Sequence, residues 1–188
     1  MKLIHNNKHL NSWVHKIIRE MSKDNWIPDY IVGITRGGLV PAAMLSHYLD
    51  VPMHTLNISF RDNDLGPESN LWMAEDAYGY VPYEGTELPV VRDPNRVTNN
   101  PALRKKILVV DDINDSGRTL NWIKEDWASG CLPQDPAWAD IWHDNVRFAV
   151  MVDNLSSGFQ DVDYCGTEIN KEETPCWIVF PWENWWEN

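Results

Sequence analysis

Apolar residues recur along this chain in two distinct patterns. Near the N-terminus they stand at helical spacing, which predicts an amphipathic helix over residues 8–23 with a buried stripe of Leu10, Trp13, Val14, Ile17, Ile18 and Met21. Further along, short continuous apolar runs occur at residues 30–34 and 107–110, and residues 53–59 and 146–152 also read as strands. Such runs are typical of strands that are buried on both faces of a sheet. Helices are predicted after two of them, from residue 39 onward and over residues 119–127.

The order of these elements predicts an α/β fold. A strand, a helix and a second strand in succession form the unit of a parallel sheet. Repeated alternation predicts a doubly wound, mostly parallel sheet with helices on both faces. At 188 residues the chain is expected to form one domain, residues 1–188.

Two stretches lack a clear period. Residues 60–104 contain many turn-forming residues, and an irregular stretch of this length inside a compact domain is usually a functional loop. Residues 129–144 contain Pro133 and Pro136 and are expected to form an irregular insertion.

Residues 107–120, with the sequence ILVVDDINDSGRTL, carry the most informative chemistry. The apolar run stops at Asp111 and Asp112, and a small polar loop then leads into the predicted helix. Backbone N–H groups that open onto a helix N-terminus suit a phosphate group. Paired carboxylates suit sugar hydroxyls and a hard cation such as Mg²⁺. The stretch therefore predicts a ligand that contains phosphate, a polyol and a metal ion, bound at the carboxyl end of a strand.

A second candidate anion site follows the strand at residues 30–34. Thr35, Arg36, Gly37 and Gly38 form a short loop before the next predicted helix. Glycines let the backbone approach an anion closely, and an arginine offers a planar pair of donors. This loop is the second predicted oxyanion cradle.

Composition narrows the choice of partners and compartment. The chain has 16 Lys and Arg against 28 Asp and Glu, a net charge of −12, which argues against non-specific nucleic-acid binding. The three cysteines are odd in number and lack CxxC spacing, which favours reduced thiols. The first ten residues lack an apolar signal core, and no apolar run is long enough to cross a membrane. We therefore expect a cytoplasmic protein without a membrane or nucleic-acid partner.

Three motifs together resemble one enzyme family. The pattern of residues 107–119 resembles the phosphoribosyl pyrophosphate (PRPP) signature of type I phosphoribosyltransferases. The sequence GITRGGLVPA at residues 33–42 resembles the pyrophosphate loop of xanthine–guanine and related purine enzymes, and residues 177–182 resemble their Trp-Ile-x-x-Pro-Trp ending. The resemblance implies transfer of ribose 5-phosphate from PRPP to a nucleobase of the purine class, with Mg²⁺ as cofactor. It also implies a small C-terminal hood (residues 154–188), a long mobile flap (residues 61–104) and a homodimer or higher homo-oligomer.

The resemblance assigns roles to the two loops. Asp111 and Asp112 would hold the ribose hydroxyls, directly or through Mg²⁺. Asp115 would be the general base that takes a proton from the purine. The 5′-phosphate would be wrapped by the loop that runs from the base into the helix, which comprises Asp115, Ser116, Gly117, Arg118 and Thr119. Pyrophosphate would lie on Thr35, Arg36, Gly37 and Gly38.

The base site follows the family pattern only in part. Trp177 matches the tryptophan that lies over the purine, and Ile178 matches the residue whose backbone contacts the purine edge. The family places a lysine, the donor to the purine 6-oxo group, ten residues before a tyrosine. Here that position, counted from Tyr164, is Asn154, and an amide can either donate or accept. An adenine-like or other base therefore stays open.

Other points also stay open at this level. Arg61, Arg92, Arg96 and Arg104 are candidates to reach pyrophosphate. A regulator of the same fold would bind PRPP or a nucleotide without turnover. A related enzyme could use a pyrimidine or another acceptor, and an inactive scaffold could use the tryptophan-rich tail as an interaction surface.

Overall fold

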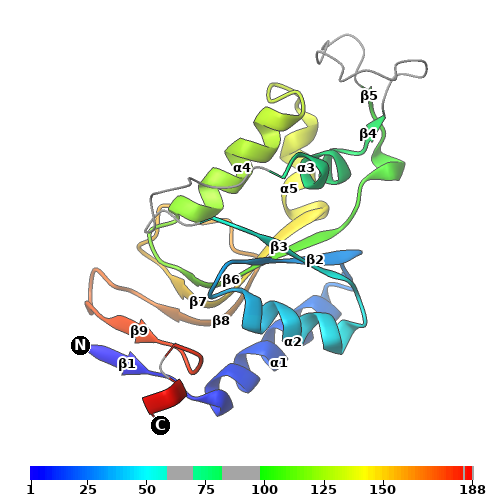
Figure 1. Cartoon of the computed structure of the whole chain (residues 1–188). Helices are drawn as coiled ribbons and strands as arrows, with labels where there is room; N and C mark the ends of the chain where they lie inside the picture. The colour runs from blue at the N-terminus through cyan, green and yellow to red at the C-terminus, as the bar shows by residue number, and fades with distance from the viewer. Residues whose placement is uncertain (59–69, 82–97, 184, 188) are drawn as a thin grey trace.

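Five parallel strands form the main sheet of the protein. The computed structural model describes residues 1–58, 70–81, 98–183 and 185–187. The strand order is β3, β2, β6, β7, β8 (Figure 1), and every neighbouring pair is parallel. The bounds are β2 Tyr30–Ile34, β3 Met53–Leu56, β6 Ile107–Asn114, β7 Val146–Asn154 and β8 Tyr164–Ile169.

Helices cover both faces of this sheet, as Figure 1 shows. Helices α1 (Asn7–Lys23) and α2 (Leu39–Leu49) lie on one face, below the sheet in the view. Helices α3 (Leu71–Tyr78), α4 (Arg118–Gly130) and α5 (Ala137–Asp144) lie on the other. The predicted doubly wound, mostly parallel α/β fold is therefore confirmed.

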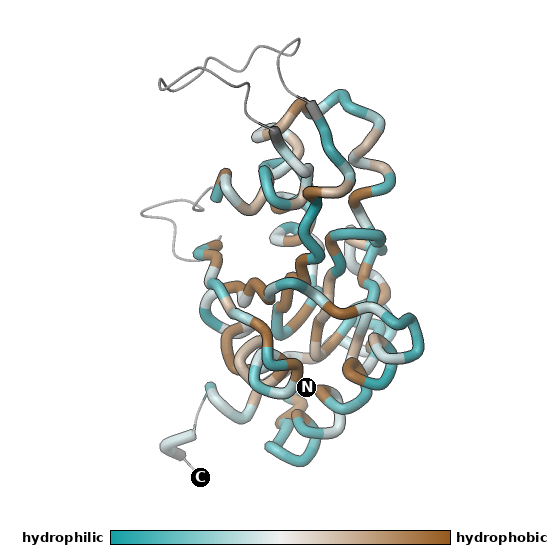
Figure 2. Tube along the Cα trace, turned by 90° about the vertical axis from the view of Figure 1, so that its right-hand side faces the viewer, coloured by the Kyte–Doolittle hydropathy of each residue, from teal (hydrophilic) through white to brown (hydrophobic). Residues whose placement is uncertain are grey.

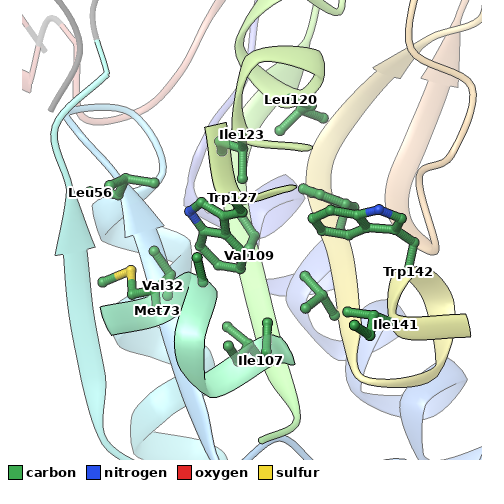
Figure 3. Close-up of a cluster of buried hydrophobic side chains, with 14 of the residues drawn as sticks. Val32, Leu56, Met73, Ile107, Val109, Leu120, Ile123, Trp127, Ile141 and Trp142 are labelled. Carbon is green, nitrogen blue, oxygen red and sulfur yellow. The ribbon is translucent and has the colours of Figure 1, made fainter. Parts of the chain in front are cut away.

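The two cores explain why the central strand is an unbroken apolar run. Ile107 and Val109 of β6 face the core under α3, α4 and α5, which Figure 3 shows in close-up. Leu108 and Val110 face the core against α1 and α2. Side chains alternate between the faces of a strand, so burial on both faces requires apolar residues at consecutive positions. The trace coloured by hydropathy likewise shows apolar segments gathered in the interior (Figure 2).

A small two-stranded sheet pairs a strand near the N-terminus with a strand near the C-terminus. Strand β1 (Lys2–Ile4) pairs in parallel with β9 (Trp177–Val179), with Leu3 opposite Ile178, as Figure 1 shows. Strand β9 lies within the predicted C-terminal hood, residues 154–188. Strand β8 within that range belongs to the main sheet, and the small sheet takes one strand from the N-terminus.

Several predicted boundaries were wrong. Strand β6 does not stop at Val110 but continues to Asn114, because β7 extends alongside it and pairs Asp111 with Val150 and Asn114 with Asp153. Asp111 and Asp112 therefore lie within the strand. Strand β3 ends earlier than predicted, at Leu56, and helix α4 continues to Gly130.

The two stretches predicted to be irregular contain helices. Residues 129–144 include α5, whose Trp138, Ile141 and Trp142 are buried in the core. Figure 3 labels Ile141 and Trp142. Part of the predicted flap is also core, since α3 buries Met73, Ala77 and Tyr78. The remaining short elements are β4 (Tyr80–Val81), β5 (Thr98–Asn99), η1 (Pro101–Leu103) and η2 (Trp185–Glu187). Across the described ranges, no helix combines the length and apolar character needed to cross a bilayer.

Candidate active site

The two predicted anion loops meet at the carboxyl ends of β2 and β6, which are neighbours in the sheet. A Cβ atom placed on Gly37 would lie 1.8 Å from Oδ2 of Asp112, so the loop after β2 rests directly on that carboxylate. A Cβ atom on Gly38 would lie 2.3 Å from the carbonyl oxygen of Val110. With Asp112 in its present position neither site has room for a side chain, and at position 38 the obstructing atoms are backbone atoms. The close approach joins the two loops into one site.

Each of these loops ends at a helix that begins after a glycine. Helix α2 follows Gly38 and helix α4 follows Gly117. Glycine has no side chain to cap a first turn, and the N-terminal end of a helix carries a partial positive charge. Two helix N-termini therefore open at the same edge of the sheet, where an anionic ligand is favoured.

The loop around Gly117 is fixed by close packing against the β7–β8 connection. Gly117 has a φ of +81°, a conformation that glycine adopts without strain. A Cβ atom there would lie 2.4 Å from the backbone nitrogen of Phe159. Ser116 accepts a hydrogen bond from the Gly158 N–H through its carbonyl oxygen, at 3.2 Å. The predicted phosphate loop is therefore held from behind by residues 157–159.

A buried amide completes this support. Asn114 is 1% exposed, and its Nδ2 donates to Oδ1 of Asp153 at 2.8 Å and to the carbonyl oxygen of Phe159 at 2.9 Å. Its Oδ1 accepts from Oγ of Ser157 at 2.7 Å. Burial raises the pKa of the Asp153 carboxyl, and the hydrogen bond from Asn114 acts in the opposite direction. Asn114 was not among the predicted site residues, since its role depends on partners far along the chain.

Asp111 and Asp112 are consecutive residues within the C-terminal half of β6, and both are partly exposed. The backbone N–H of Asp112 donates to Oδ1 of Asp111 at 2.9 Å. Within the described residues, no three His, Cys, Asp or Glu side chains gather into a metal-binding group. Mg²⁺ is commonly held by one or two carboxylates together with substrate oxygens. The two aspartates beside the glycine loop fit that donor set.

The loop after β2 is anchored through Thr35. Its backbone N–H donates to the carbonyl oxygen of Leu56 at 3.0 Å, and its Oγ1 donates to Oδ1 of Asn57 at 3.0 Å. The peptide bond between Thr35 and Arg36 is cis, and Arg36 is exposed. The loop is thus tied to the end of β3 while its arginine faces solvent.

Asp115, the predicted general base, forms an ion pair that the sequence did not indicate. Its Oδ1 lies 2.7 Å from Nζ of Lys171, which follows strand β8. The side chains are 38% and 18% exposed, respectively. Lys171 matches no motif, and only the arrangement of the parallel strands brings it to the site.

Asn154, at the predicted base-contacting position, is turned toward the protein. It is 5% exposed, and its Nδ2 donates to the carbonyl oxygen of Asp115 at 2.8 Å. Its Oδ1 accepts from the Lys171 N–H at 3.0 Å and from Oγ of Ser156 at 2.9 Å. The amide therefore holds two segments of the site together.

The predicted stacking residues lie on strand β9 of the small sheet. Trp177 is 51% exposed and borders a hollow of about 470 Å³, whose other lining residues are Met1, Lys2, Pro175 and Cys176. The Ile178 side chain is buried in the core with α1 and α2, which leaves its backbone as the part of the residue that could meet a ligand.

One of the four candidate flap arginines is described. Arg104 donates from Nε and Nη2 to Oδ1 of Asn99, at 3.3 and 2.9 Å. Arg61, Arg92 and Arg96 lie outside the described residues, as does most of the predicted flap.

Known proteins with similar sequences and structures point to one family. The model of the phosphoribosyl transferase domain matches residues 2–185. A xanthine-guanine phosphoribosyltransferase from Cereibacter sphaeroides is 28% identical over 161 residues, which are 85% of this chain and 72% of that protein.

Two solved structures share the fold. The purine phosphoribosyltransferase from Pyrococcus horikoshii has a TM-score of 0.59 and 23% identity, over 97% of this chain and 94% of that one. The xanthine-guanine-hypoxanthine phosphoribosyltransferase of Helicobacter pylori has a TM-score of 0.59 and 18% identity, over 99% and 97%. Because the family model spans nearly the whole chain and the predicted loops meet in one site, the protein belongs to the phosphoribosyl transferase domain family, the enzyme class that its motifs indicated.

Proposed function

We propose that this protein is a Mg²⁺-dependent phosphoribosyltransferase that transfers ribose 5-phosphate from PRPP to a ring nitrogen of a purine and releases pyrophosphate. The observation that carries the proposal is the contact of Gly37 with Asp112, which joins the two anion loops into one site. PRPP carries a monophosphate at C5′ and a pyrophosphate at C1′ of one ribose, and two such loops on either side of paired carboxylates match that layout.

In the proposed reaction, the bond from ribose C1′ to the pyrophosphate oxygen breaks and a bond from C1′ to the purine nitrogen forms. Asp111 and Asp112 hold the ribose hydroxyls. Bound Mg²⁺ would neutralise part of the pyrophosphate charge, held by the same two carboxylates. The Gly117 loop and the N-terminus of α4 bind the 5′-phosphate, with Ser116, Arg118 and Thr119 around it.

The leaving group and the acceptor are held at opposite sides of C1′. Thr35, Arg36, Gly37 and Gly38 bind pyrophosphate as negative charge develops on it. Asp115 accepts the proton that the purine ring nitrogen loses, which contributes about 10²- to 10⁴-fold to the rate. Fixing base and ribose in line supplies the rest of the acceleration through orientation.

Support for a purine acceptor comes from the names of the similar proteins, which are xanthine-guanine or purine phosphoribosyltransferases. Trp177 would stack on the bicyclic base and the Ile178 backbone would contact its edge. We also expect the enzyme to act as a homodimer or higher homo-oligomer, which sedimentation at several protein concentrations would measure.

The test begins with calorimetric titration of the protein by PRPP, with and without Mg²⁺. Release of pyrophosphate is then measured with a panel of purines and pyrimidines. We expect Mg²⁺-dependent PRPP binding and turnover with a purine. PRPP binding without turnover of any base would instead favour a regulator, and absence of PRPP binding would contradict the proposal. Asp140→Asn changes an exposed residue of α5 and serves as the control for variants of the candidate site. It should bind PRPP and release pyrophosphate as the unchanged protein does.

A further inference from the structure

We infer that His5 and His9 form a pH-sensitive switch at the N-terminal end of α1: when the two imidazoles take up protons, the first turn of α1 loses part of its cap and strand β1 separates from β9. The switch concerns the small sheet, and it does not depend on the proposed reaction. Figure 1 shows β1 leading directly into α1, so a change at the start of the helix acts directly on the strand.

The cap of α1 requires an unprotonated histidine. The side-chain oxygen of Asn6 accepts from the backbone N–H groups of Lys8 and His9, at 3.0 and 3.2 Å. In return, the Asn6 N–H donates to Nδ1 of His9 at 3.2 Å, so a histidine stands where a capping box usually has Glu or Gln. Both ring nitrogens of a protonated histidine are donors. Protonation of His9 therefore removes one of the two reciprocal bonds of the cap.

The two imidazoles are in contact with each other. Their ring centroids lie 5.2 Å apart, and the His5 ring also lies 4.7 Å from the ring of Trp13. Nδ1 of His5 is buried and, among the residues that the structure describes, has no hydrogen-bond partner. A proton on that nitrogen would be a buried donor without an acceptor, which is costly. Burial, and after it the charge of His9, lower the pKa of His5.

The residues around the pair do not offset these protons. The first turn of α1 contains no acidic residue, and the N-terminal end of a helix carries a partial positive charge. Within the described ranges, neither imidazole is bonded to a carboxylate. Strand β9 has no ionisable side chain, and Glu183 after it accepts from the Phe180 N–H at 2.8 Å. On strand β8, which packs against α1, Glu168 accepts from Sγ of Cys165 at 3.9 Å.

The other ionisable groups of this region are basic. On β1 and over residues 7–17 of α1 they are the N-terminal ammonium, Lys2, Lys8, His15 and Lys16. Two further positive charges at His5 and His9 would therefore add to an electrostatic environment that is already unfavourable for them.

The pair is joined directly to the small sheet. The His5 N–H donates to the carbonyl oxygen of Val179 at 2.9 Å, and the Trp177 N–H donates to that of Met1 at 2.8 Å. Strands β1 and β9 have three residues each, and a two-stranded sheet is marginally stable by itself. A small loss of stability at the start of α1 is therefore enough to loosen β1, and with it the support of β9, which carries Trp177.

The direction of the effect follows from the lowered pKa of His5. A histidine whose pKa is lower in the folded than in the unfolded chain takes up its proton more readily when unfolded. Its contribution to stability is then complete above about pH 6.5, the ordinary value, and is lost as the pH falls below it. Strand β1 should thus be held at about pH 7.5 and loosened at about pH 5.5.

The test is hydrogen exchange of the full chain, followed by peptide mass spectrometry over residues 1–10 and 170–180. Exchange is compared at each pH with that of the urea-unfolded chain, so that the intrinsic pH dependence cancels. We expect the protection of both segments to fall about tenfold from about pH 7.5 to 5.5, roughly the effect of one lost helix cap.

Two variants should reduce this fall. His9→Glu supplies a carboxylate acceptor at the same position of the capping box and stays ionised over this pH range, so protection should change less than about threefold. His5→Phe keeps an aromatic ring against Trp13 and cannot take up a proton, so it should remove part of the fall.

His15→Gln is the matched control, because it removes an exposed histidine of the same helix away from the cap. It should show the full fall in protection. The inference would be overturned by a protection that stays constant in the unchanged protein, or by a fall in His9→Glu as large as that in His15→Gln. If His5→Phe did not fold, His9→Glu alone would decide. None of these results bears on PRPP binding, which is measured separately.

Discussion

The hydroxyl of Ser157 donates to Oδ1 of Asn114 at 2.7 Å, and both side chains are buried. Asn114 ends β6, and Ser157 lies in the connection from β7 to β8. The phosphate loop starts at the next residue after Asn114, so this bond ties the loop to the sheet from behind. It is one of the buried polar contacts that support the candidate site.

Asn114→Ala should lower the free energy of unfolding by about 2–4 kcal/mol, since several buried polar groups lose their partner at once. Urea denaturation followed by tryptophan fluorescence would measure the change. Asn121→Ala removes a longer bond of 3.2 Å to the carbonyl oxygen of Gly158 near the surface and should cost about 0.5 kcal/mol or less. Equal effects of the two variants would contradict the importance given to Asn114.

Gly37→Ala and Gly38→Ala should separate function from folding. The new methyl at position 37 would meet the Asp112 carboxylate, which can rotate away, so PRPP affinity should fall at least about tenfold with little change in Tm. The methyl at position 38 would meet the carbonyl oxygens of Val110 and Ile34, at 2.3 and 2.9 Å, which cannot move as freely. That variant should therefore lose stability, by about 1–3 kcal/mol. Calorimetric titration with PRPP and thermal unfolding would together measure both effects, and a reversed order would count against the described loop packing.

Asp115→Asn should lower kcat by about 10²- to 10⁴-fold and leave PRPP binding within a few-fold, because an amide cannot accept the purine proton as a carboxylate does. Single-turnover kinetics and PRPP titration would report the two quantities. Asp140→Asn should behave as wild type. Full activity of Asp115→Asn would show that another group is the base.

Cys165 should alkylate slowly at neutral pH. Burial is the main cause that raises the pKa of its thiol to about 11. The thiolate is the reactive form, so the rate with iodoacetamide should rise about tenfold per pH unit through pH 8–10. Peptide mass spectrometry would follow this site, and the urea-unfolded protein, where an ordinary thiol pKa of about 8.5 applies, is the reference. A rate that levels off near pH 9 in the folded protein would contradict the shifted pKa.

The spacing of apolar residues along the chain correctly predicted those helices and strands whose buried faces are made of apolar side chains. Residues 107–110 are apolar at every position because β6 lies between two cores, and that run was predicted as a strand. The stripe from Leu10 to Met21 likewise predicted α1. The two anion loops were predicted because the backbone can approach an anion closely where the residue is glycine.

Short elements were missed because neighbouring structure stabilises them. Helices α3 and α5 are each eight residues long and lie in turn-rich stretches. Helices of that length are not stable alone and depend on packing, here through Tyr78 and Trp138. Strand β8 has few apolar residues, and its pairing with β7 makes it a strand.

The sequence by itself thus determined the fold class, the two anion loops and the aspartates between them, since each depends on residue types that lie close together in the chain. Only the tertiary structure decided which distant residues complete the site. The pairing of β1 with β9, the support of Asn114 by Ser157 and the approach of Lys171 to Asp115 all follow from how the strands are ordered in space. Contacts of this kind depend on strand order and register, and no local pattern encodes them.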